Sequence, residues 1–305
     1  MEKRYFDLNS YFRSIYGVRV QKVTVDAGFT CPNRDGKLSY GGCIYCNPKG
    51  SGTGAHGKGL SVGDQIESGK ERVKRRYKNS KFLAYFQSYS NTYAPVEHLK
   101  KLYDEALSVE DVVGLSIGTR PDCVDPEKIS LLQSYTDKYL IWIEYGIQTI
   151  HDKSLTLINR GHDYKAFEKA VAITKNKGIK ICAHIIIGIP GETRDDILET
   201  AKEMARLKID GVKIHLLYVV KGTKLHEMYD NNEFECLTQN EYIELTCDFL
   251  ELLPKETIIQ RVTGDPHSDE LVAPSWPLTT KSQTITKINQ TLENRNSYQG
   301  KYCNL

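Results

Sequence analysis

Short runs of β-branched and aromatic residues alternate with longer helical patterns along most of the chain, and this alternation constrains the fold most strongly. It is typical of parallel strands joined by helices, in which a strand buried on both faces is nearly continuous in apolar residues. The run KICAHIII at 180–187 has this character. We predict six parallel strands, at 18–25, 81–87, 112–117, 139–148, 180–187 and 212–220.

Six β/α units are fewer than the eight of a complete TIM barrel. We therefore predict an α/β fold, a partial (β/α)6 TIM-type barrel of parallel strands over residues 1–225, with a C-terminal α/β extension over residues 226–305 packed on it. The extension is expected to hold a helix, a short strand and a final helix, at 235–253, 257–262 and 279–294. Helices between the strands are expected at 63–78, 95–107, 126–136, 151–177 and 193–207, the fourth broken at 160–162.

The composition, 40% hydrophobic and 26% charged over 305 residues, is that of a folded globular protein and excludes disorder and collagen. No apolar run approaches the roughly 20 residues that span a bilayer, and the start MEKRYFD has no apolar signal core. We therefore expect a cytoplasmic protein without a membrane segment. A formal net charge of +2 leaves the partner open.

Three of the eight cysteines crowd into the loop 26–47, in a C-x11-C-x2-C arrangement of Cys31, Cys43 and Cys46. In a long chain without an export signal, such thiols are reduced or bind metal. A structural zinc site usually has four protein ligands, and His56 or Cys303 could supply the fourth only from outside this loop. An iron–sulfur cluster with one open iron fits three ligands, and buried free cysteines are the remaining alternative.

The cysteine loop leaves the carboxyl end of the first predicted strand, where the loops of an α/β barrel build the active site. Polar or glycine residues follow the other strands in the same way. Each alone could be a turn, a strand-end hydrogen bond or an ion pair such as Arg120 with Asp122. Gathered on one rim, they indicate an active site containing Gln87, Ser88, Arg120, Gln148, Gly188 and Lys221.

Four further segments accompany the loop: EYGIQ at 144–148, RGH at 160–162, HIIIGIPGET at 184–193 and VKIHLLYVVKGT at 212–223. Together they resemble radical S-adenosylmethionine (SAM) enzymes. The segments DAGFTCPNRDG, YFQSYSNTY and TGDPHSDELVAPSW resemble more closely the branch that contains the Elongator catalytic subunit and the YhcC/YtqA-like (MnmL-type) proteins. This resemblance covers nearly the whole chain.

The resemblance implies two cofactors, a [4Fe–4S] cluster held by Cys31, Cys43 and Cys46 and a SAM molecule that chelates the fourth iron. Reductive cleavage of SAM would give a 5′-deoxyadenosyl radical. An electron donor such as flavodoxin or ferredoxin is then required. The positions that match SAM contacts of the family are Gln87, Ser88, Gln148, Arg160, His184, Gly188 and Tyr218.

The same resemblance implies a reaction on transfer RNA, the trimming of 5-carboxymethylaminomethyl to 5-aminomethyl on the wobble uridine. A fixed cation at the active rim would orient the substrate carboxylate, and Arg120, Lys213 and Lys221 are the candidates. Two alternatives stay open: a radical SAM enzyme that acts on a small molecule or a protein, and a non-catalytic module with structural zinc.

The segment KERVKRRYKNSK at 70–81 is strongly basic. It is either a solvated helix face or a surface that follows RNA phosphates. Its extension through Lys281, Lys287, Arg295 and Lys301, and base stacking on Tyr89 and Tyr93, belong to the second interpretation. The glycine-rich stretch 52–59 lacks the Ser or Thr of a phosphate-binding P-loop, so we predict a flexible loop there.

Overall fold

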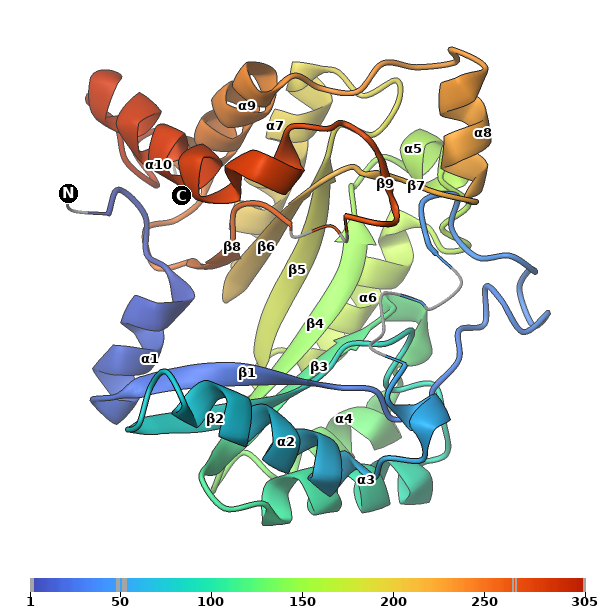
Figure 1. Cartoon of the computed structure of the whole chain (residues 1–305), viewed down its shortest axis with the longest axis vertical. Coiled ribbons are helices and arrows are strands. Elements are labelled where there is room, and N and C mark those ends of the chain that lie inside the picture. Colours follow the sequence, from blue (N-terminus) through green and yellow to red (C-terminus); the bar gives the residue numbers. More distant parts are fainter. Residues whose placement is uncertain (1–2, 48–49, 51–53, 265, 267, 304–305) are drawn as a thin grey trace.

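A curled sheet of seven parallel strands forms the centre of the molecule, in a computed structural model that describes residues 3–47, 50, 54–264, 266 and 268–303 without the side chains of 279–281. The strand order is β1-β2-β3-β4-β5-β6-β8, so chain order and spatial order agree, as in a barrel that does not close (Figure 1). The strands are β1 (Arg19–Val25), β2 (Ser80–Phe86), β3 (Val112–Thr119), β4 (Leu140–Gln148), β5 (Lys180–Ile187), β6 (Gly211–Leu216) and β8 (Ile258–Arg261).

Helices cover the outer face of this sheet (Figure 1). Three of them begin with a capping box, in which Ser61, Thr193 and Thr238 each accept from a backbone N–H three residues on. The helices that connect successive strands are α2 (Val62–Lys74), α3 (Val96–Ser108), α4 (Pro126–Gln133), α5 (Asp152–Leu157), α6 (Tyr164–Thr174) and α7 (Arg194–Arg206). The remaining elements are α1 (Leu8–Tyr16), α8 (Lys224–Asp230), α9 (Gln239–Leu252), α10 (Pro277–Asn294), the short strands β7 (Val219–Val220) and β9 (Leu271–Ala273), and the 3-10 helices η1 (His56–Lys58) and η2 (Pro121–Cys123).

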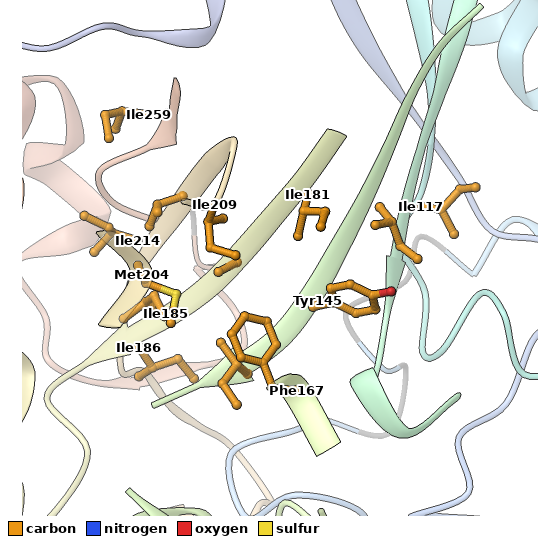
Figure 2. Close-up of a cluster of buried hydrophobic side chains, with 14 of the residues drawn as sticks. Ile117, Tyr145, Phe167, Ile181, Ile185, Ile186, Met204, Ile209, Ile214 and Ile259 are labelled. Carbon is orange, nitrogen blue, oxygen red and sulfur yellow. The ribbon is translucent and has the colours of Figure 1, made fainter. Parts of the chain in front are cut away.

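Two apolar clusters hold the sheet in place. The larger lies between the sheet and its outer helices, where Phe167 of α6 and Met204 of α7 meet strand isoleucines such as Ile185 (Figure 2). The smaller fills the concave side at the amino ends of the strands, where Phe12 of α1 packs against Trp142 and its neighbours. Because α1 closes this end, the interior opens only toward the carboxyl ends, as far as the described residues show.

The predicted partial barrel is confirmed, with two differences in its strands. The expected strand 257–262 is β8, and it pairs in parallel with β6 instead of packing on the barrel from outside. The expected strand 212–220 ends as β6 at Leu216, and its last residues form β7, which pairs antiparallel with β9. The segment after the proposed boundary at residue 225 therefore supplies the seventh strand of the barrel sheet.

The helical predictions missed two helices, α1 and α8. Nothing helical was expected before the first strand, where α1 begins after its N-cap Asp7. Nothing helical was expected at 224–230 either, where α8 lies. The break expected at 160–162 is present, since α5 ends at Leu157 and α6 begins at Tyr164. Part of the expected flexible loop, residues 52–53, lies outside the described residues. Among the described helices, none is both long and apolar enough to span a bilayer.

Candidate active site

A cavity of about 680 Å³ opens at the carboxyl ends of the strands. Its size is within the range of sites for small molecules and cofactors. The structure brings ten of the predicted site residues to its wall, while Ser88, Gly188 and Lys221 lie outside the lining. The ten are Cys31, Cys43, Cys46, Gln87, Arg120, Gln148, Arg160, His184, Lys213 and Tyr218.

The three cysteines of the loop 26–47 are free thiols, and backbone hydrogen bonds shape the loop around them. The N–H of Arg34 donates to the carbonyl of Cys31 at 2.8 Å, and the N–H of Cys46 donates to that of Cys43 at 3.0 Å. The Arg34 guanidinium donates to the Cys46 carbonyl at 2.8 Å, and the Asn33 amide donates to Asn159 at 2.6 Å. These bonds fasten the loop both to itself and to the segment before Arg160.

The guanidinium of Arg160 places a positive charge beside the buried thiol of Cys43. It donates to Sγ of Cys43 at 3.4 Å and through Nε to the carbonyl of Gly146 at 3.0 Å. Burial raises the pKa of Cys43, but the charge and hydrogen bond of Arg160 and the charge of Arg120 outweigh it, so the pKa is lowered. Arg160 therefore favours the thiolate, the form of cysteine that binds metal.

Arg120 forms the ion pair with Asp122 that the sequence left open as an alternative. Its Nε and Nη2 donate to the carboxylate of Asp122 at 2.8 and 2.7 Å, and its Nη1 donates to the carbonyl of Arg160 at 2.7 Å. The planar fork that would hold a substrate carboxylate is therefore occupied by Asp122. Arg120 positions Arg160 in this arrangement.

On five of the seven strands, a polar side chain or a tyrosine lies two residues after an apolar one, on the face that lines the barrel interior. Because side chains on a strand alternate with period two, residues i and i+2 share a face. In each pair, the residue nearer the amino end of the strand belongs to the apolar cluster around Trp142. The residue nearer the carboxyl end faces the cavity or lies directly beneath it. The pairs are Val20 and Lys22, Leu83 and Tyr85, Trp142 and Glu144, Cys182 and His184, and Ile258 and Gln260.

Glu144, which is fully buried, is the centre of this polar layer. Its carboxylate accepts from His184 Nε2 at 2.6 Å and from Lys213 Nζ at 3.1 Å, and it also pairs with Lys22 and Ser116. Burial raises the pKa of Glu144, but Lys213, Lys22 and His184 outweigh it and hold that pKa well below its ordinary value. The carboxylate thus stays ionised and compensates two ammonium groups, the buried one of Lys213 and the half-buried one of Lys22.

We did not predict Lys22, Tyr85 or Glu144 as site residues, and Lys213 was predicted to grip substrate. Lys213 instead donates to Tyr85 Oη at 2.8 Å as well as to Glu144. A charged residue in the middle of an otherwise apolar strand was the available signal, as in RVQKVTV, IWIEYGIQ and GVKIHL. Its meaning depends on the register that places the three charges together.

The polar layer predicts a pH-dependent stability. Burial, followed by the charge of Lys213, lowers the pKa of His184 to about 4, so the ring is neutral near pH 7. Between the unfolded value of about 6.5 and this value the unfolded chain binds more protons, so stability falls as pH falls. We expect His184 to remove about 2 kcal/mol between about pH 7.5 and pH 5. Urea midpoints at both pH values measure this change.

The variant His184→Gln provides the control, because a glutamine amide donates to Glu144 but does not titrate. We expect its stability to change less between the two pH values than that of the wild type. Equal slopes for the two proteins would show that His184 is not the group responsible.

The remaining predicted residues lie at strand ends with distinct local conformations. Gln148 has a positive φ of 77°, which turns the chain at the end of β4. The hydroxyl of Ser88 is buried, with no hydrogen-bond partner among the described residues. Gly188 has φ of 99°, and a Cβ there would lie 3.1 Å from Leu237. Lys221 is exposed at the surface.

Comparison with known proteins gives the class first. The Radical SAM superfamily domain matches residues 31–204, and the Radical_SAM C-terminal domain matches residues 209–294. The chain therefore belongs to the radical SAM superfamily.

Two relatives then define its place within that superfamily. YtqA of Bacillus subtilis (strain 168) is 42% identical over 99% of this chain and 93% of its own length. YhcC of Escherichia coli (strain K12) is 36% identical over 86% of this chain and 84% of its own length. The protein is a member of the Elongator-like YhcC/YtqA family, which confirms the resemblance seen in the sequence.

Two further similarities connect the chain to Elongator-type proteins. The tRNA uridine(34) acetyltransferase of Methanocaldococcus jannaschii is 31% identical over 50% of this chain and 28% of its own length. The solved structure of the archaeal Methanocaldococcus infernus Elp3 with an N-terminal deletion has a TM-score of 0.70 at 20% identity, covering 92% of this chain and 64% of that chain. At this identity the structural likeness concerns the fold.

The cofactors follow from the superfamily, whose members bind a [4Fe–4S] cluster and SAM. The residues present fit both groups, because three free thiols and several hydrogen-bonding side chains line one cavity. Gly146 keeps part of its wall open, since a Cβ there would lie 2.7 Å from Arg160 Nη2 and 2.8 Å from Gln148 Nε2. The cofactor predictions are thus confirmed, and structural zinc is set aside.

Proposed function

We propose that this protein removes the carboxymethyl group from 5-carboxymethylaminomethyluridine at the wobble position of transfer RNA, leaving 5-aminomethyluridine. The observation that carries the proposal is a cavity whose wall holds both the cysteine triad and an excess of cationic side chains. Such a wall suits an anionic substituent that is brought close to a radical source. The sequence similarity to a tRNA uridine(34) acetyltransferase supports wobble uridine as the target.

In the proposed site, Cys31, Cys43 and Cys46 hold the cluster, and Gln87, Gln148, Arg160, His184 and Tyr218 surround SAM. When bound, the two groups supply a 5′-deoxyadenosyl radical that abstracts a hydrogen atom. Arg160 keeps positive charge beside the Cys43 sulfur, and Arg120 holds Arg160 in place through its carbonyl. Beneath the cavity, the hydrogen bonds of the Glu144 carboxylate hold the side chains of His184 and Lys213 in place.

The substrate chemistry is consistent with this site. Hydrogen abstraction from the carbon between the amine and the carboxylate gives a radical that both neighbours stabilise. Loss of one electron to the oxidised form of an electron-transfer protein, and of the amine proton to water, yields an imine, and water hydrolyses it to the 5-aminomethyl group and glyoxylate.

Anaerobic reconstitution tests the proposal. The protein is supplied with iron, sulfide, SAM, dithionite and tRNA from a strain that lacks the gene, and 5′-deoxyadenosine, nucleosides and glyoxylate are followed by mass spectrometry. We expect all three to change together. Formation of 5′-deoxyadenosine without a changed nucleoside would instead favour a small-molecule or protein substrate, and 5-aminomethyluridine without glyoxylate would exclude the imine route.

The basic segment lies at the end of the sheet opposite the cavity. Helix α2 ends at Lys74, next to the start of β2, and Arg19 at the start of β1 lies 4.3 Å over the Tyr77 ring (Figure 1). Any RNA contact with this segment is therefore remote from the wobble base. Arg295, expected to extend the surface, instead forms ion pairs with Glu244, Asp248 and Glu251, and the side chain of Lys281 is outside the described residues.

We expect the triple variant Lys74→Ala, Arg75→Ala, Arg76→Ala to weaken tRNA binding and to lower the slope of log K against log salt by about 2, less than three charges would give. Lys74 contributes little because Asp111 already pairs with it at 3.0 Å. Filter binding over a salt series measures this slope. A control that removes the exposed lysines 165, 169 and 202 should leave it nearly unchanged. An unaltered slope in the triple variant would show that RNA does not use this surface.

A further inference from the structure

The cation that faces the cavity without a partner is Arg261, the last residue of β8. It is half-buried and lines the cavity, yet its guanidinium makes no hydrogen bond or ion pair with any residue that the structure describes. The other Lys and Arg side chains of the wall are engaged. Arg34 donates to the carbonyls of Cys46 and Asn47, Arg120 pairs with Asp122, Arg160 contacts Gly146 and Cys43, and Lys213 pairs with Glu144. An unpaired guanidinium inside a cavity is costly unless it serves a ligand.

The neighbours of Arg261 increase this positive charge. Its Cα is paired with that of Lys213 across the two strands. Burial, followed by the charge of Arg261, holds the pKa of His215 well below its ordinary value, so that ring adds a neutral hydrogen-bonding group on the same wall. Lys22 and Lys213 share the one carboxylate of Glu144, so the interior keeps a net positive charge before Arg261 is counted.

We infer that Arg261 is the residue that recognises the substrate, by holding its carboxylate in the bidentate geometry that a guanidinium fork offers. This assignment rests on the proposed function and replaces Arg120, Lys213 and Lys221 in that role. Strand β8 forms one edge of the sheet, whereas the cysteine loop follows β1 at the other edge, so the cavity lies between the two. A carboxylate held at Arg261 therefore extends the substrate across the cavity toward the cysteine side.

Other anions are less suited to this position. Two of the residues proposed to contact SAM lie away from β8, since Gln87 follows β2 and Gln148 ends β4. A backbone phosphate would need to enter the interior of the barrel, whereas a substituent on an extruded base reaches it naturally. Arg261 therefore distinguishes the carboxymethylaminomethyl group from substituents without a carboxylate.

Binding provides a test that does not depend on turnover. The probes are an anticodon stem-loop that carries the carboxymethylaminomethyl group and the same stem-loop with the carboxylate replaced by its amide. With the reconstituted, unreduced wild type, we expect the carboxylate form to bind about 10-fold more tightly. Arg261→Gln should bind both forms equally, and Arg261→Lys should recover part of the preference. Arg13→Gln, an exposed arginine of α1, is the matched control and should behave as the wild type.

Turnover measurements distinguish failure of the Arg261 assignment from failure of the proposed function. We expect Arg261→Gln to lower kcat/KM for the nucleoside change by about 10²-fold, with unchanged KM for SAM and unchanged iron content. A raised KM for SAM would assign Arg261 to SAM, and equal weakening of both stem-loops would assign it to a phosphate; either result overturns the inference. An active wild type with an equally active Arg261→Gln overturns the inference alone, whereas a wild type that leaves the nucleoside unchanged overturns the proposed function as well.

Discussion

Replacing Cys43 with serine should reduce 5′-deoxyadenosine formation to background, a loss of at least about 10³-fold, and should remove most of the bound iron. The side chain is buried and receives a hydrogen bond from Arg160, which favours the thiolate. A serine hydroxyl at neutral pH offers no comparable anionic sulfur ligand to iron. Iron and sulfide content, the electron paramagnetic resonance spectrum after dithionite, and 5′-deoxyadenosine by mass spectrometry measure the effect.

The matched control is Cys236→Ser. Cys236 is a partly buried free thiol outside the cavity lining, and burial raises its pKa to about 11. We expect this variant to keep its iron and its activity. Wild-type iron content in Cys43→Ser would contradict the assignment of Cys31, Cys43 and Cys46 as the cluster ligands.

The second large effect is expected for Glu144→Gln. The variant leaves Lys22 and Lys213 in the interior without the carboxylate that compensates them, and it replaces the charged acceptor of His184 with a neutral amide. Breaking a buried ion pair from one side costs about 3–5 kcal/mol. We expect a loss of this size in the free energy of unfolding, measured from urea midpoints at about pH 7.5.

A surface glutamate separates this effect from the loss of a charge as such. Glu227 pairs with Lys224 at 2.8 Å on α8, with both side chains exposed. Glu227→Gln should leave the urea midpoint nearly unchanged, because exposed ion pairs contribute little. A midpoint for Glu144→Gln close to that of the wild type would mean that the two lysines are not held charged in the interior.

The parallel strands were predictable because each is a run of apolar residues bounded by turn signals, and this local pattern does not depend on distant contacts. The run 180–187 is β5 without a shift of either boundary. The short strand β8 was also recognised as a strand. Its pairing with β6 was not predicted, because the two segments lie more than forty residues apart in the chain.

The cysteine triad could likewise be identified from the sequence, since all three thiols lie in one loop and their spacing alone suggests a shared metal centre. Arg120 shows the limit of that reasoning. Its place on the rim was predicted correctly. Only the tertiary structure shows that its guanidinium pairs with Asp122 and also donates to the carbonyl of Arg160.

The sequence by itself thus determined the class of fold, the cysteine triad of the active-site loop and the family, because each depends on residues that are near one another in the chain or on motifs that the family shares. The tertiary structure decided which charges compensate one another. Glu144 meets Lys22 and Lys213, which come from strands widely separated in sequence, and Arg261 is the cation for which the described residues offer no partner. Electrostatic energy depends on distance in space, and for these groups the register and curvature of the sheet set that distance.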